Sequence, residues 1–229
     1  MRAKFVGCLI VCFLAGSLYA AEEVTLKTPR EKVSYIIGVQ IGSQLKGDAI
    51  DVDPILVGRG IQDAVAGNKL LLSDQDARDT MNTFQKQQEA KQSAQRKQQG
   101  EKNKKEGDAF LAENKKKAGV KTTASGLQYK VIKEGTGKMP KVTDTVTANY
   151  KGTLLDGREF DSSYRRGEPA TLPLSGVIPG WSEALQLMKE GSKWQLFIPP
   201  QLAYAEKGAG NVIGPNATLI FEVELISVK

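Results

Sequence analysis

Hydrophobic residues in the first third of the chain recur at the spacing of an α-helix. Between residues 28 and 72, successive gaps of three, one, four and four positions place them on one helical face. The residues of that face are Val33, Ile36, Ile37, Ile41 and Leu45. Pro29 suits the first turn of this helix, where the N–H that proline lacks would have no intrahelical partner.

A second helix is predicted directly afterwards. Asp53 can cap its start, Pro54 suits its first position, and Gly67 follows its last residue. Two helices of this size bury little apolar surface by themselves. We therefore expect this region to pack against a partner.

The following region is polar on every side. Ala77, Met81 and Phe84 form a narrow apolar stripe after Ser73, and between residues 85 and 108 Ala90 and Ala94 are the apolar residues. Good helix formers dominate, so the sequence predicts one helix over residues 74–117, about 65 Å long. A helix that is polar all round is either solvent-bridging or unstable, which leaves disorder as the alternative. A coiled coil is excluded, because residues 85–108 lack an apolar heptad repeat.

From about residue 122 the hydrophobic period changes from helical to alternating. Leu127, Tyr129 and Val131 alternate with polar residues, as do Phe221, Val223 and Leu225, which is typical of half-buried antiparallel strands. Asp156-Gly157 predicts a hairpin turn. Trp181, Leu185 and Met188 have helical spacing. The predicted fold is α+β: an antiparallel sheet wrapped on one short helix, preceded by an all-α domain and a long connecting helix.

The first residues have the layout of a secretory signal peptide. Arg2 and Lys4 precede a short apolar run, and small residues follow near Ala20 and Ala21. The run is shorter than the roughly 20 residues of a membrane-spanning helix. Lipidation at Cys12 is disfavoured because Val11 precedes it. We expect residues 1–21 to be a signal peptide and the protein to be exported to the periplasm, the outer membrane or the cell surface.

Composition removes most kinds of covalent chemistry. The chain has no histidine, and its two cysteines, Cys8 and Cys12, lie in the expected signal peptide. Neither a Cys–His nucleophile nor a common zinc site is available to the mature chain, and we expect no metal and no cofactor. The net charge is +6, but basic residues are mixed with acids and glutamines, so no nucleic-acid partner is expected. The groups still available for function are carboxylates, tyrosines, lysines and backbone amides, together with the shape of an apolar cavity.

Residues 176–181 read GVIPGW and precede the short helix. Alone, this stretch fits either core packing at a helix start or the floor of an apolar pocket. In its wider context, VTANYKGTLLDGREFDSSYRRGEPATLPLSGVIPGWSEALQLMKEGSKWQLFIPPQLAYAEKGAG followed by IGPNATLIFEVELI, it closely resembles the FKBP-type peptidyl-prolyl isomerases from about Gly126 to Lys229. The helical region, with SYIIGVQIGSQL and GIQDAVAG, resembles the dimerisation domain of the macrophage infectivity potentiator group of these isomerases.

The resemblance implies a prolyl pocket and assigns its residues. Trp181 would form the floor, Val177 and Ile178 one wall, and the Ile178 N–H would hold the substrate carbonyl that follows proline. Further expected binding residues are Tyr150, Phe160, Arg166, Tyr204, Val212, Ile213 and Phe221. Catalytic roles are implied for Asp161, Tyr204, Ile178 and Trp181, with Asp161 orienting rather than transferring protons. This chain has Ala170 where the family often has an aromatic residue, Ala205 where glycine is common, and Ala209 where histidine is frequent.

The resulting expectation is a non-covalent peptidyl-prolyl cis-trans isomerase that acts as a dimeric catalyst-chaperone. Its domains would be the signal peptide (1–21), a dimerisation domain (22–84), a linker helix (85–121) and the isomerase domain (122–229). Expected partners are proline-containing polypeptides, a second copy of the chain and rapamycin-like macrolides. The alternative is a holdase or surface-binding protein that uses the pocket without turnover.

Overall fold

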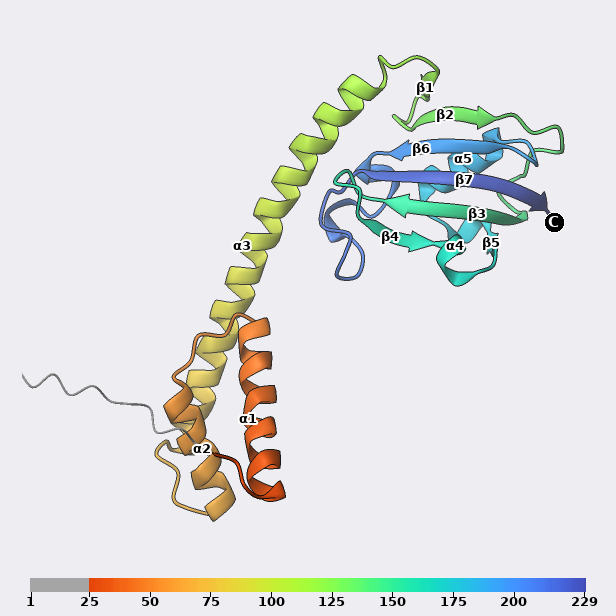
Figure 1. Ribbon diagram of the computed structural model, residues 1–229. Helices are drawn as coiled ribbons and strands as arrows, with labels where there is room; N and C mark the ends of the chain where they lie inside the picture. Colours follow the sequence, from red (N-terminus) through yellow and green to blue (C-terminus); the bar gives the residue numbers. More distant parts are fainter. Residues whose placement is uncertain (1–24) are drawn as a thin grey trace, which may run out of the picture. The chain divides into compact units, whose positions relative to one another are not determined.

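The computed structural model describes residues 25–229. The expected signal peptide, Cys8 and Cys12 lie outside the described residues. The chain divides into two compact units between Asp74 and Gln75. Each unit is described by itself below (Figure 1).

The first unit contains helices α1 (Pro29–Gly47) and α2 (Pro54–Ala66). The predicted ends of α2 are confirmed, because the Asp53 side chain accepts hydrogen bonds from the first turn and Gly67 adopts a left-handed conformation with φ of 69°. At α1, Thr28 and Glu31 form a capping box. Local capping therefore defines both helices.

The apolar side chains of this unit remain largely open to solvent. Ile36 and Ile37 are 54% and 51% exposed, and Ile55 is 80% exposed. Between α1 and α2 lies an apolar groove of about 430 Å³, which Ile41 and Leu45 help to line. The first unit thus has an unfilled apolar surface, as its small size predicts.

The predicted long helix is confirmed as α3 (Asp74–Asn114), which is continuous through Gly100 and Gly107. Disorder, the alternative interpretation of this segment, is not supported. The carboxyl-terminal half of α3 differs from the polar, solvated helix that the sequence indicates. It buries Gly100, Gly107 and Asn114, because it packs against the sheet that follows.

Seven antiparallel strands form one sheet in the second unit (Figure 1). Six follow the order β1-β2-β6-β7-β3-β4, and β5 pairs with β3. Their bounds are β1 (Val120–Thr122), β2 (Gln128–Lys133), β3 (Thr145–Thr153), β4 (Glu159–Ser162), β5 (Ala170–Pro173), β6 (Lys193–Ile198) and β7 (Leu219–Val228). The helices are α4 (Ser163–Arg166) and α5 (Pro179–Leu187), and the 3₁₀ turns are η1 (Leu174–Gly176), η2 (Pro200–Leu202) and η3 (Ala205–Lys207).

The core of this unit lies between the sheet and α5. Trp181 and Leu185 on α5, with Met188 at its end, pack against alternating strand residues such as Val223 and Leu225. Leu185, Met188 and both of these strand residues are fully buried, and each such side chain stabilises the fold by about 1.5–3 kcal/mol. The predicted α+β fold is confirmed, and so is the Asp156-Gly157 hairpin between β3 and β4. Sequence reasoning missed β1, β5 and α4, which are only three or four residues long.

Candidate functional site

The second unit contains a cavity of about 660 Å³, which we call the aromatic cavity. Residues from β3, β4, β5, β7, the start of α5 and the segment 204–213 surround it. Its lining consists of Tyr150, Phe160, Asp161, Leu172, Gly176, Val177, Ile178, Trp181, Tyr204, Ala209, Gly210, Asn211, Val212, Ile213 and Phe221. The site is thus assembled from six separate segments of the chain.

Four aromatic rings interlock at this cavity, mostly edge to face. The ring centroids of Trp181 lie 5.3 Å from Phe221 and 5.0 Å from Tyr150, and Phe160 lies 5.4 Å from Phe221. Such pairs contribute about 0.5–1.5 kcal/mol each beyond their buried area. Trp181, Phe221 and Tyr150 are almost completely buried. The rings therefore form a rigid apolar surface.

Two glycines make this arrangement possible. A Cβ on Gly152 would lie 2.6 Å from the Phe160 ring and 2.7 Å from the Phe221 ring. A Cβ on Gly180 would lie 2.5 Å from Ile198 on β6. Gly152 therefore admits two cavity rings over β3, and Gly180 brings the start of α5, with Trp181, close to the sheet.

The start of α5 also presents a backbone donor at the cavity. The Ile178 carbonyl accepts hydrogen bonds from the N–H groups of Trp181 (2.9 Å) and Ser182 (3.1 Å), which begins the helix. Pro179 occupies the first helical position. Among the backbone hydrogen bonds of residues 25–229, none uses the Ile178 N–H. That donor is available to a ligand.

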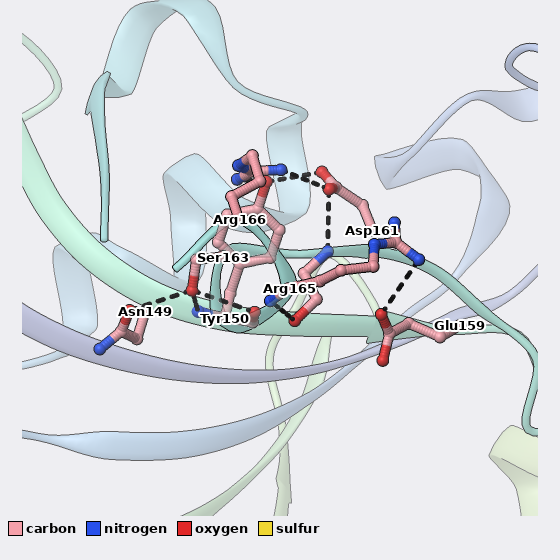
Figure 2. A network of polar contacts seen from close by, with 8 residues as sticks. Asn149, Tyr150, Glu159, Asp161, Ser163, Arg165 and Arg166 are labelled. Atoms are coloured by element: carbon pink, nitrogen blue, oxygen red, sulfur yellow. Dashed lines mark hydrogen bonds and ion pairs between the residues drawn. The ribbon is translucent and has the colours of Figure 1, made fainter. Parts of the chain in front are cut away.

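A polar triad borders the aromatic rings (Figure 2). The Tyr150 hydroxyl donates to Asp161 Oδ2 over 2.5 Å, and Arg166 Nη1 donates to Asp161 Oδ1 over 2.6 Å. Arg166 Nη2 also donates to the Tyr150 hydroxyl oxygen over 2.7 Å. Each residue of the triad thus contacts the other two.

The triad keeps Asp161 charged. Burial opposes ionisation, but hydrogen bonds from the Tyr150 hydroxyl and from Arg166, with the positive charge of Arg166, lower the pKa of Asp161 below its usual value. Burial and the bond to Asp161 raise the pKa of Tyr150. At neutral pH the site therefore holds a carboxylate and an intact phenol, and neither group is poised for proton transfer.

The backbone beneath the triad is fixed by polar side chains (Figure 2). Ser163 Oγ accepts a hydrogen bond from the Tyr150 N–H over 2.9 Å and donates to Asn149 Oδ1 over 3.0 Å. Ser162 caps α4, the single helical turn that carries Arg166. These contacts join β3 to α4, and they explain how four residues form a stable turn.

The remaining wall is the loop of residues 204–218, which we call the cover loop. It contributes Tyr204, Val212 and Ile213 to the cavity. Ala209 and Ile213 hydrogen-bond to each other in both directions, with N–O distances of 2.8 and 3.1 Å. Ala205 has φ of 48°, a left-handed conformation that favours glycine. A glycine at this position would adopt the same conformation without that strain.

The structure brings together every site residue named from the sequence. Ten of the eleven line the aromatic cavity, and Arg166 contacts two of those ten, Tyr150 and Asp161, from outside the lining. Sequence reasoning missed Leu172, which lies on the short strand β5. It also missed the loop positions Gly210 and Asn211, for which no periodic signal exists. Ala170 does not line the cavity, and Leu172 borders it from the same strand.

Neither a metal-binding cluster nor a membrane-spanning helix occurs among the described residues. Within residues 25–229, no cluster of three or more acidic, cysteine or histidine side chains could hold a metal ion. Over the same range, no helix combines the length and apolar character needed to cross a bilayer.

An antiparallel sheet that covers one helix and closes on an aromatic cavity defines an α+β domain of the FKBP type. Residues 136–226 match the family described as FKBP-type peptidyl-prolyl cis-trans isomerase. Residues 30–131 match the domain described as amino terminal to that isomerase. The chain belongs to the FKBP-type peptidyl-prolyl cis-trans isomerase family, and it is an isomerase of the macrophage infectivity potentiator-like group.

Individual relatives match along almost the whole chain. The outer membrane protein MIP of Legionella longbeachae is 46% identical over 230 residues, which cover 100% of this chain and 99% of the relative. The peptidyl-prolyl cis-trans isomerase Mip of Coxiella burnetii is 47% identical, with the same coverage. The crystal structure of FkpA from Escherichia coli is 40% identical, covers 90% of this chain and 99% of its own, and has a TM-score of 0.71.

Proposed function

We propose that the aromatic cavity is the site where the enzyme isomerises the peptide bond before a proline. The observation that supports this most directly is the convergence of four aromatic rings on one cavity beside the unused Ile178 N–H. A proline ring is compact and apolar, and it suits such a surface. The Ile178 N–H would bind the carbonyl that follows proline, and the Tyr204 hydroxyl would bind a second polar group.

Rotation about a peptide bond requires no nucleophile. The barrier of about 18–20 kcal/mol reflects lost amide resonance, and no bond is made or broken. The planar amide is more dipolar than the twisted amide, so a cavity that excludes water favours the twisted form. Accelerating rotation by about 10⁵ requires roughly 7 kcal/mol. Binding of the twisted shape by the aromatic walls, with the Ile178 N–H, would supply it.

Asp161 would act as a fixed charge and an orienting group. It is bonded to both Tyr150 and Arg166, and its lowered pKa keeps it ionised. A carboxylate in this state orients the Tyr150 ring, which stands edge-on to Trp181.

A peptide assay with conservative cavity variants tests this proposal. Phe160→Leu and Phe221→Leu remove edge-to-face contacts at the cavity, so kcat/KM on a short prolyl peptide should fall about tenfold. Tyr129→Leu is the matched control, because Tyr129 on β2 makes an aromatic contact with Trp194, 4.4 Å between ring centroids, and does not line the cavity. Wild-type protein that binds the peptide without turnover would favour the holdase alternative. If both cavity variants kept the kcat/KM of the wild type, the site assignment would be overturned.

We infer that two chains associate through the first unit, which ends at Asp74 and so lacks the last ten residues of the expected dimerisation domain, 22–84. The supporting observation is the exposed apolar surface of α1 and α2, with the groove that Ile41 and Leu45 line. A second copy would cover this surface and contribute the same residues from its own helices. Light scattering should give twice the chain mass, and Ile37→Glu should shift the protein toward monomer. A monomeric wild type at micromolar concentration would contradict this.

We also propose that the enzyme is exported and assists proteins that fold outside the cytoplasm. The charge and apolar pattern of residues 1–21 supports a signal peptide, and the relative from Legionella longbeachae is called an outer membrane protein. Fractionation of producing cells would separate a periplasmic pool from a surface pool.

Rapamycin-like macrolides should compete with peptide, because they would occupy the same aromatic cavity.

A further inference from the structure

The side of α3 that meets the sheet unit carries a regular row of small and polar residues. Arg96, Gly100, Asn103, Gly107 and Asn114 follow one another at gaps of four, three, four and seven, which is one face of a helix. Gly100, Gly107 and Asn114 are buried on a helix that is otherwise solvated. On this packing surface glycines and polar side chains make up the row, and Phe110 beside it adds a ring contact to Phe197 on β6, with 5.8 Å between the ring centroids.

This face of α3 holds the cover loop by its backbone. Arg96 Nη2 donates to the Lys207 carbonyl over 2.8 Å, and Asn103 Nδ2 donates to the Pro215 carbonyl over 2.7 Å. A Cβ on Gly100 would lie 3.2 Å from Pro215. Helix and loop lie side by side (Figure 1). These contacts join the two over about two turns of α3.

Helix α3 and the cover loop come closest at Gly107, one turn after Asn103. A Cβ on Gly107 would lie 2.3 Å from Thr218 Oγ1 and 3.3 Å from Thr218 Cβ. Beyond it, Asn114 donates to Gln128 over 3.0 Å, and Gln128 donates to the Leu111 carbonyl over 2.9 Å. The end of α3 is therefore fixed to β2, and the glycine allows the helix to approach the end of the cover loop.

The opposite side of the cover loop forms the cavity wall. Tyr204, Val212 and Ile213 line the aromatic cavity, whereas Lys207 and Pro215 between and beyond them are held by α3. The regular structure within the loop consists of the single turn η3 and the Ala209–Ile213 pair. It contains left-handed residues at Ala205 and Asn216. A strained loop of this kind keeps one conformation only where its surroundings support it.

We infer that the carboxyl-terminal half of α3 is a positioning element for the isomerase site, because it holds the cover loop against the aromatic cavity. This inference rests on the proposed function of the cavity. It gives α3 a role in turnover itself, beyond the connection of the two units. Arg96, Asn103 and Gly107 are positioning residues, since they act through the loop and do not line the aromatic cavity.

A two-residue cycle in the full-length protein tests the contact. Gly107→Ala adds a methyl group against Thr218 and favours the helix intrinsically, so the expected damage is to docking and not to α3. Thr218→Ala removes the hydroxyl that the methyl group would meet. That buried hydroxyl has no hydrogen-bond partner within the described chain, so its loss alone should be nearly neutral. We expect Gly107→Ala to lower kcat/KM on a prolyl peptide about tenfold, and Thr218→Ala to restore it in the double variant.

A second variant removes a hydrogen bond without adding bulk. Asn103→Ala deletes the bond to the Pro215 carbonyl, and Gln98→Ala, at an exposed position of the same helix, is its matched control. Asn103→Ala should lower kcat/KM several-fold, and Gln98→Ala should leave it unchanged.

Amide hydrogen exchange separates positioning from global stability. In Gly107→Ala and Asn103→Ala, the Ala209 and Ile213 amides should exchange faster, while the Val223 and Leu225 amides of β7 keep wild-type rates. Unchanged loop exchange and unchanged kcat/KM in both variants would overturn the inference, and so would equal acceleration across β7. A wild-type protein without turnover would contradict the proposed function instead, and loop exchange would still report on α3.

Discussion

Replacing Asp161 by asparagine tests whether the polar triad orients the cavity or transfers a proton. Asparagine keeps an oxygen that can accept from the Tyr150 hydroxyl, but it removes the negative charge. A hydrogen bond to a charged group contributes about 1.5–3 kcal/mol, and a neutral one about 1 kcal/mol. The Asp161 side chain is 41% exposed, so solvent screening reduces the difference. We expect Asp161→Asn to lose about 0.5–1 kcal/mol of folding stability at pH 7.

The stability difference should depend on pH with a defined sign. The pKa of Asp161 is lower in the folded protein than its unfolded value of about 3.9. Its stabilising contribution is therefore complete above that value and disappears as pH falls through the folded pKa. Thermal unfolding should separate wild type from Asp161→Asn by about 2 °C at pH 7, and the two curves should begin to converge below about pH 4 and meet below the folded pKa of Asp161.

Turnover should depend on pH differently if Asp161 only orients. The chain has no histidine, the pKa of Asp161 is lowered and that of Tyr150 is raised, so no group of the triad titrates between pH 5 and 9. We expect wild-type kcat/KM on an uncharged prolyl peptide to be flat over this range, and Asp161→Asn to lower it about tenfold at every pH. Asp156→Asn is the matched control, because Asp156 lies in the exposed β3–β4 turn. If wild-type kcat/KM rose or fell with pH and Asp161→Asn removed that dependence, the orienting role would be refuted and acid-base catalysis indicated.

Three further results are expected from the same geometry. Ala205→Gly relieves a left-handed alanine and should raise stability by about 0.5–1 kcal/mol in denaturant unfolding; a loss of stability would show that the strain is not at this residue. Gly152→Ala forces the Phe160 and Phe221 rings apart, so macrolide and peptide binding should weaken together, which a fluorescence titration measures. A fragment of residues 92–229 keeps the α3 contacts and should match the full chain on a tetrapeptide. The fragment should be slower than the full chain in refolding of a proline-limited protein, because a long client can engage both sites of the proposed dimer. Equal refolding rates would contradict that dimeric engagement.

The sequence predicted those parts of the fold that local chemistry determines. Asp53 and Gly67 marked the ends of α2 because caps require particular side chains and conformations. Strands β3 and β7 were visible because nine or ten residues are enough to show alternation. Strand β5 and helix α4 have four residues each, too few for a period, and they exist through pairing with β3 and through the Ser162 cap.

The candidate site was predicted for a different reason. Taken singly, Phe160 or Phe221 is an ordinary core residue, and periodicity could not distinguish a cavity wall from a packed interior. The joint spacing of the aromatic residues carried the resemblance to the isomerases, and that resemblance named all eleven residues. Leu172 and Asn211 were not predicted, because the motif does not single them out, although both line the same cavity.

The packing of α3 shows what a search for apolar stripes overlooks. A helix can dock through hydrogen bonds to a loop backbone and through glycines that remove side chains, and neither feature raises hydrophobicity. Gly100 and Gly107 are poor helix formers within a run of good ones, yet they are where α3 comes close to Pro215 and Thr218. A solvated spacer is thus consistent only with the part of α3 that precedes Arg96. The part that begins there is packed against the domain whose turnover it would influence, so bending of α3 and shape of the cavity are expected to be coupled through Pro215 and the cover loop.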